Sequence, residues 1–246
     1  IFGNRENPLL VSVRSGAATS MPGMMDTILN LGMTEAVLTG FAGRDEAEFG
    51  RSLYDRFTTG WQETISGEAD RNIPNDHWQQ LFGALIAVIG SWDNPRARLY
   101  REHHGISHKL GTAVNVQAMV YGNRDERSGT GVVFSHNVNT GTRGMYGEFL
   151  PCAQGEEVVA GIRTPHLIEF LKDWNQPVYE ELERAVTLLS SHEHSMVEVE
   201  FTIESGVLYF LQYRKAKAAL EARITSIVHD IWKKKFTLES GLSQIS

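Results

Sequence analysis

The residues best suited to chemistry begin with a lone arginine. Arg14 ends a short β-branched run that starts at Val11, and residues 15–23 then supply small hydroxyl side chains with the glycines Gly16 and Gly23. Glycine lets the backbone approach an anion closely, exposed N–H groups bind it, and a guanidinium adds a permanently charged, bidentate partner. This segment is typical of a phosphate-binding loop. A solvent-exposed turn between a strand and a helix is the alternative.

A second group of polar residues lies on a predicted β-hairpin. Glu198 and Glu200 alternate with apolar residues in one strand, and Gln212 and Arg214 have the same spacing in the next. Because side chains of a strand alternate between its two faces, each pair shares one face. Mg²⁺ prefers a few carboxylate oxygens together with ligand phosphates. The face could therefore hold a magnesium–phosphate group, or it could be a solvated surface with ion pairs.

Two weaker signals concern a connecting segment and the cysteine. Residues 154–161 carry Glu156 and Glu157, either of which could accept a hydrogen bond from a ribose hydroxyl while the adjoining backbone pairs with an adenine edge. An ordinary connection is the alternative. Cys152 has no charged neighbour that would activate its thiol, so we expect a small filler residue rather than a nucleophile. The histidines show no spacing typical of a metal site.

Alternating helical and strand patterns must position these residues. We expect a strand at 9–13, four helices between 34 and 105, strands at 112–120, 128–135 and 144–150, helices at 164–174 and 177–190, a hairpin of 196–204 and 207–212, and a helix from Arg214 onward. Asn75 is the expected N-cap of the third helix. The aromatic residues Phe49, Tyr54, Phe57 and Phe82 of the helical stretch are expected in the core.

Size and charge exclude some classes of protein. A chain of 246 residues can form one large domain or two modest ones, and its net charge of −7 argues against a nucleic-acid partner. No apolar run is long enough for a membrane span, and no leader is evident. The single cysteine excludes an intrachain disulfide and favours a cytoplasmic location. Since the chain begins at Ile1, we expect a piece of something longer or a processed product.

The sequence resembles the N-terminal, nucleotide-binding part of the pyruvate, phosphate dikinase family. The most specific match is the run Met21-Pro-Gly-Met-Met-Asp-Thr27, and the similarity covers nearly the whole chain. The segments that carry it are residues 10–17, 20–32, 111–117, 128–131, 146–149, 153–165, 200–204 and 208–212.

The resemblance implies an α+β fold of ATP-grasp type, with two mixed lobes and an all-helical insertion. The implied parts are a partial first lobe with the phosphate loop at 1–34, the helical insertion at 35–108, the second lobe at 109–214 and a helical linker at 215–246. The implied activity is Mg²⁺-dependent transfer of the β-phosphoryl group of ATP to a histidine on a separate domain, on the way to phosphoenolpyruvate. From the resemblance we expect the phosphohistidine domain and the pyruvate-binding domain to lie outside this chain.

The resemblance also implies roles for individual residues. Catalytic roles fall on Arg14, Gln212 and Arg214, nucleotide contacts on Gly23, Met24, Met25, Gln117, Met119, Thr130, Glu156, Glu157 and Val158, and metal ligation on Glu198 and Glu200. The chain departs from the family in having Glu198 where an aspartate is usual and His136 where an arginine is usual.

Other functions stay open. The chain could belong to a shortened, non-catalytic paralogue that binds nucleotide or a partner, or to a related dikinase with another phosphoryl acceptor. Incomplete lobes would expose apolar surface, so self-association is also expected. No membrane or nucleic-acid partner is expected.

Overall fold

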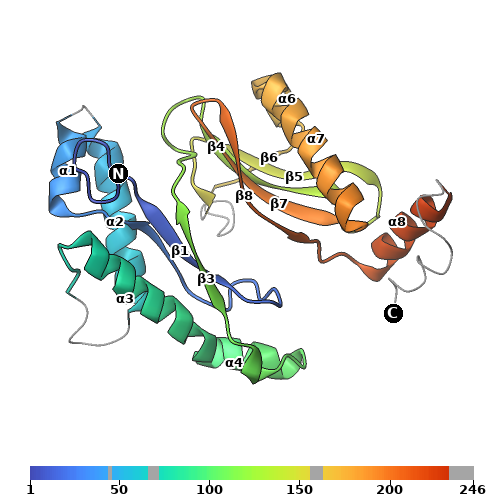
Figure 1. The fold of residues 1–246 in the computed structure, drawn as a ribbon. Coiled ribbons are helices and arrows are strands. Elements are labelled where there is room, and N and C mark those ends of the chain that lie inside the picture. The colour runs from blue at the N-terminus through green and yellow to red at the C-terminus, as the bar shows by residue number, and fades with distance from the viewer. Residues whose placement is uncertain (44–45, 66–71, 156–162, 233–246) are drawn as a thin grey trace. The chain divides into compact units, whose positions relative to one another are not determined.

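The computed structural model describes residues 1–43, 46–65, 72–155 and 163–232. These residues form two compact units, Ile1–Met119 and Val120–Ser246. Both units combine helices with antiparallel sheets, so the predicted α+β fold class is confirmed (Figure 1).

The first unit contains a three-stranded sheet of order β2-β1-β3 (Figure 1). Its strands are β1 (Val11–Gly16), β2 (Thr27–Leu31) and β3 (Ala113–Ala118). The central strand β1 pairs with β3 from Val11↔Ala118 to Gly16↔Ala113. This pairing places residues 113–118 in the first unit, whereas the family resemblance implied a second lobe that begins at residue 109. Strand β2 was not predicted. The sequence pattern after the loop was compatible with a helix, and no strand was assigned to residues 27–31.

Helices fill the stretch between β2 and β3, as predicted. They are α1 (Glu35–Ala42), α2 (Ala47–Thr64), α3 (His77–Gly90) and α4 (Pro95–His103), with short 3₁₀ turns η1 (Ser91–Asp93) and η2 (His108–Leu110).

Helix α3 packs on the sheet through one narrow stripe. Gln80, Ala84 and Val88 are its buried residues, and the Gln80 amide accepts from the Gly32 N–H at 2.9 Å. Phe82 lies two residues from that stripe, about 200° around the helix from Gln80, and is 61% exposed. The expectation that Phe82 is a core residue is therefore wrong, whereas the same expectation for Phe57 is confirmed.

The start of α3 also corrects the sequence analysis. Asp76, not Asn75, is the N-cap, and its carboxylate accepts from the Gln79 N–H at 2.8 Å. Both residue types cap helices well, so the sequence alone could not choose between neighbours.

The second unit contains a five-stranded sheet of order β6-β5-β4-β7-β8. Its strands are β4 (Gly129–His136), β5 (Arg143–Pro151), β6 (His166–Leu167), β7 (Val197–Glu204) and β8 (Val207–Lys215). Its helices are α6 (Phe170–Trp174), α7 (Gln176–Glu193) and α8 (Leu220–Trp232).

One face of this sheet forms the apolar core with α6 and α7 (Figure 1). The inward residues of β7 are Val197, Val199, Phe201 and Ile203. Because they alternate with Glu198, Glu200, Thr202 and Glu204, the covered face is apolar and the opposite face is polar.

Two predicted helices begin later than expected. The segment 164–174 starts as the short strand β6, and only its end is helical. Likewise, β8 continues through Arg214 to Lys215, and α8 begins at Leu220. In both places pairing with a neighbouring strand decides the conformation of residues whose local pattern is ambiguous.

Candidate functional site

The structure places three candidate residues of the first unit on one sheet. Arg14 lies opposite Asn115, and Ser12 lies opposite Gln117, so Arg14 and Gln117 project from the same face of β1 and β3. Met119 follows β3 directly, and its N–H donates to the Leu10 carbonyl at 2.9 Å. The proposed phosphate-binding arginine and the proposed nucleotide contact Gln117 therefore belong to one surface.

The glycine-containing loop connects β1 to β2. Strand β1 runs through Gly16, so the connection consists of residues 17–26 rather than beginning at Ser15. Gly23 is exposed and has a φ of 70°, in the left-handed region, and a Cβ there would meet nothing within 4 Å. Met24 and Met25 are half-buried. The turn at Gly23 thus depends on glycine for its backbone conformation rather than for space.

Five candidate residues of the second unit share the polar face of its sheet. Glu198 lies opposite Arg214, and Glu200 lies opposite Gln212. Thr130 on the neighbouring strand lies opposite Thr202, which continues the same alternation. Next to the turn the register runs from Glu204↔Val207 to Phe201↔Phe210, and if continued it would set Leu211 and Tyr213 opposite Glu200 and Glu198. A bulge between Glu200 and Phe201 leaves one extra residue in β8, and this shift places Gln212 and Arg214 on the face of the two carboxylates.

The Glu198 and Arg214 side chains form an ion pair across these strands. Their side chains are only 11% and 26% exposed, so this end of the hairpin is not a solvated surface. Thr130 is buried as well, and its hydroxyl donates to the Phe201 carbonyl at 3.0 Å. The polar face is therefore ordered by defined contacts at both ends.

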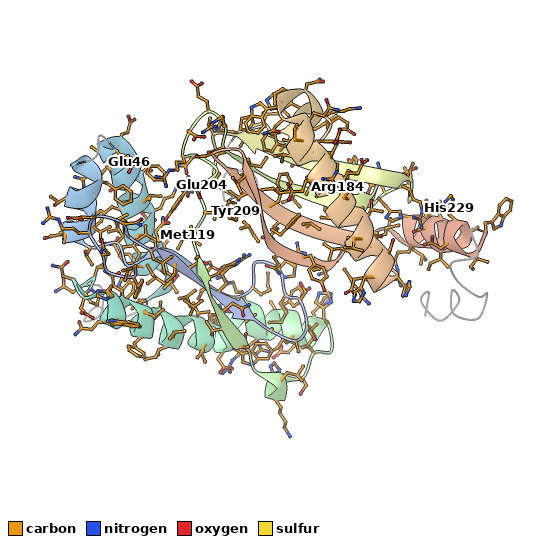
Figure 2. The ribbon with its side chains drawn as sticks, turned by 45° about the horizontal axis from the view of Figure 1, so that its top comes forward. Glu46, Met119, Arg184, Glu204, Tyr209 and His229 are labelled. Carbon is orange, nitrogen blue, oxygen red and sulfur yellow. The ribbon has the colours of Figure 1, made fainter. Side chains whose placement is uncertain are left out.

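Sequence reasoning missed Glu204, which continues the alternation of Glu198 and Glu200. Its carboxylate accepts from the Tyr121 N–H and from Arg124 Nη1, both at 3.1 Å. Burial, followed by the nearby Glu204 charge, raises the pKa of Tyr121 above its usual range, so this phenol stays protonated. Figure 2 labels Glu204 and Tyr209 on the two strands next to the hairpin turn. The two-residue period could have identified Glu204.

Some predictions fall elsewhere. Glu156, Glu157 and Val158 lie outside the described residues, so their proposed contacts with the nucleoside stay predictions. Cys152 is exposed and has a φ of 48°, so its interpretation as a filler residue is wrong.

The donor set of the polar face is compatible with Mg²⁺. Within the described ranges no cluster of three or more histidine, cysteine, aspartate or glutamate side chains could enclose a metal ion. Glu198 and Glu200 are two carboxylates on one face. Mg²⁺ commonly takes only one or two carboxylate ligands from a protein when phosphate oxygens complete its coordination. Across the part of the chain that the structure describes, no helix has the length and hydropathy needed to cross a membrane.

Comparisons with known proteins match most of the chain. The model of the family described as "Pyruvate phosphate dikinase, AMP/ATP-binding domain" matches residues 2–181. The chain is 41% identical to pyruvate, phosphate dikinase of Clostridium symbiosum over 271 aligned positions, which cover 91% of this chain and 31% of that protein. It is 39% identical to the chloroplastic pyruvate, phosphate dikinase 1 of Zea mays, covering 88% of this chain and 27% of that protein. The chain thus spans less than a third of the length of these relatives.

Proposed function

The chain belongs to the family of pyruvate phosphate dikinase AMP/ATP-binding domains, and on this premise we propose that it binds Mg·ATP for transfer of the β-phosphoryl group to a histidine on another domain. The observation that carries the proposal is the pairing of Glu198 with Arg214 and of Glu200 with Gln212 on one face of the second unit. Carboxylates, an amide and a guanidinium at these positions match what phosphoryl transfer requires, namely positioning and neutralisation of charge.

Each group has a distinct part in this proposal. Glu198 and Glu200 would hold Mg²⁺, which when bound neutralises phosphate charge and fixes the phosphate geometry. Arg214 and Gln212 would donate hydrogen bonds to phosphate oxygens. Arg14 would supply a bidentate contact to a phosphate oxygen.

The Glu198–Arg214 ion pair also makes these parts interdependent. While Arg214 donates to the Glu198 carboxylate, one oxygen of that carboxylate is engaged. Metal ligation by Glu198 would therefore weaken its hold on Arg214 and leave the guanidinium to a phosphate. We expect metal and triphosphate to bind more tightly together than either does alone.

The direct test is calorimetric titration of the chain with ATP, with and without Mg²⁺. We expect binding to be at least about tenfold tighter with the metal, equivalent to about 1.4 kcal/mol, and the Glu200→Gln variant to lose most of that difference. Glu180→Gln on the exposed side of α7 is the matched control and should behave as the wild type. Binding of ATP that is indifferent to both Mg²⁺ and Glu200 would overturn the metal assignment.

The phosphoryl acceptor needs a separate experiment, because the relatives are more than three times as long as their matched parts. The full-length protein should exchange ATP and AMP in the presence of pyrophosphate and phosphate, and Arg14→Ala should abolish this exchange without lowering the melting temperature. Tight nucleotide binding without exchange would instead support the non-catalytic paralogue. A cytoplasmic location and self-association stay predictions.

A further inference from the structure

The loop that follows Gly23 is held by residues that come about 70 positions later in the chain. Arg96 Nε donates to the Met24 carbonyl at 3.1 Å, and Asn94 Nδ2 donates to the same oxygen at 3.2 Å. Arg96 Nη2 also forms an ion pair with the Asp26 carboxylate. The Asp26 N–H donates to Ser91 Oγ at 3.1 Å. Four contacts thus connect a three-residue stretch of the loop to η1 and the start of α4.

The residues that hold the loop are themselves fixed. Asn94 is the N-cap of α4, and its side-chain oxygen accepts from the Ala97 N–H at 2.7 Å. The guanidinium of Arg101, which is fully buried, lies 4.0 Å from the ring centre of Trp92. The Trp92 indole N–H donates to the His108 carbonyl at 3.2 Å. Helix α4 therefore presents Asn94 and Arg96 from a packed support.

The peptide geometry gives these contacts a direction. All peptide bonds of the described residues are trans, so the C=O of Met24 and the N–H of Met25 lie in one plane and point in opposite directions. Since two donors from α4 take the Met24 carbonyl, the Met25 N–H is aimed away from α4. A backbone N–H in a fixed direction beside a glycine turn is a donor suited to a phosphate oxygen.

We propose that Arg96, assisted by Asn94, is a positioning residue that fixes the Met24–Met25 peptide so that its N–H binds a phosphate oxygen of the nucleotide. This inference rests on the proposed function. It assigns to the helical stretch a part in phosphate binding, because α4 and its N-cap fix the conformation of a loop that lies far away in the sequence. The guanidinium is suited to this part because its fork bridges a carbonyl and a carboxylate at once.

The test compares Arg96→Met with Arg98→Met in the full chain. Both arginines are on α4, and their side chains are 55% and 59% exposed, but Arg98 pairs with Asp93 instead of with a residue of the loop. Affinities for Mg·ATP and for adenosine are measured by calorimetry, and exchange of the loop amides is followed by hydrogen-exchange mass spectrometry on a peptide that contains residues 21–28.

We expect Arg96→Met to weaken Mg·ATP binding about tenfold, the equivalent of one charge-assisted hydrogen bond, and to leave adenosine affinity within twofold. Exchange of the Asp26 amide should accelerate. Arg98→Met should change none of these quantities, and Arg96→Lys should recover only part of the loss.

The remaining outcomes would overturn either this proposal or the proposed function. Equal loss of Mg·ATP and adenosine affinity, or faster exchange with unchanged Mg·ATP affinity, would show a merely structural role and overturn the proposal. Unchanged exchange in Arg96→Met would overturn it as well. Failure of the wild type to bind Mg·ATP would overturn the proposed function, and with it this inference. The exchange data would then report only on the contact between Arg96 and the loop.

Discussion

The ion pair between Glu198 and Arg214 should contribute measurably to the stability of the second unit. The perturbation is a double-mutant cycle that combines Glu198→Gln with Arg214→Met. Both substitutions keep most of the side-chain volume and remove the charge, so their interaction energy isolates the pair.

The magnitude follows from the burial of the two side chains. Unit charges about 4 Å apart attract by about 4 kcal/mol at an effective dielectric constant of about 20, and desolvation and ordering offset part of this. Exposed pairs retain about 0–1 kcal/mol, whereas breaking a fully buried pair costs about 3–5 kcal/mol. With side chains 11% and 26% exposed, this pair lies between those limits. We expect a coupling of about 2 kcal/mol, which is about thirtyfold in an equilibrium constant.

The assay is hydrogen exchange of the β7 amides, because it reports opening of the second unit without assuming that both units unfold together. The pair of Glu193 and Lys215 provides the comparison. Its charged atoms are 3.7 Å apart and its side chains are 21% and 66% exposed, so its coupling should stay below about 1 kcal/mol. A Glu198–Arg214 coupling no larger than that of the comparison pair would refute the reasoning from burial.

Four further predictions concern the second unit, the first unit and the assembly. Hydrogen bonding from the Ser205 hydroxyl lowers the pKa of Asp125, so this carboxyl stabilises the fold above its unfolded pKa of about 4 and loses that contribution as the pH falls through its lower folded value. Urea titrations should therefore show the largest loss in the free energy of unfolding for Ser205→Ala at pH 7 and a smaller loss below pH about 4. A loss that is the same at pH 7 and at pH about 2.5 would contradict this prediction. Gly131→Ala should cost about 2 kcal/mol, since a Cβ would lie 2.7 Å from Phe201 Cζ and 2.4 Å from a carbonyl oxygen of β5. Gly60→Ala, within α2 and with nothing within 4 Å, should instead stabilise by about 0.5–1 kcal/mol, and equal melting temperatures of the two variants would oppose this steric argument. Sedimentation velocity should show a concentration-dependent increase in mass if the chain self-associates, and a constant monomer mass would exclude it.

Local pattern was sufficient for one strand of the polar hairpin but not for its partner. The alternation of Glu198 and Glu200 with valine and phenylalanine predicted their common face, but a regular hairpin from the turn would set Leu211 and Tyr213 opposite them. A bulge between Glu200 and Phe201 moves Gln212 and Arg214 onto that face, and the spacing of these residues did not predict the bulge. The orientation of β7 itself is fixed because its apolar residues are buried in the core with α7. Helical periods between 34 and 105 likewise predicted the four helices.

Contacts between distant parts of the chain could not be obtained in this way. Phe82 follows the helical pattern of a core residue, yet α3 meets the sheet through the stripe that contains Gln80, whose amide bonds with backbone groups of other segments. Strand β2 was missed because its identity depends on pairing with β1.

What the sequence by itself determined is the set of chemical groups and, where a period of two or of 3.6 residues is clear, the face on which each group lies. Only the tertiary structure decided that Glu198 engages Arg214, and that Arg96 reaches across 70 positions to Asp26. The physical reason is that periodicity records which side of an element is buried, whereas the partner of a polar side chain depends on which other element packs against it.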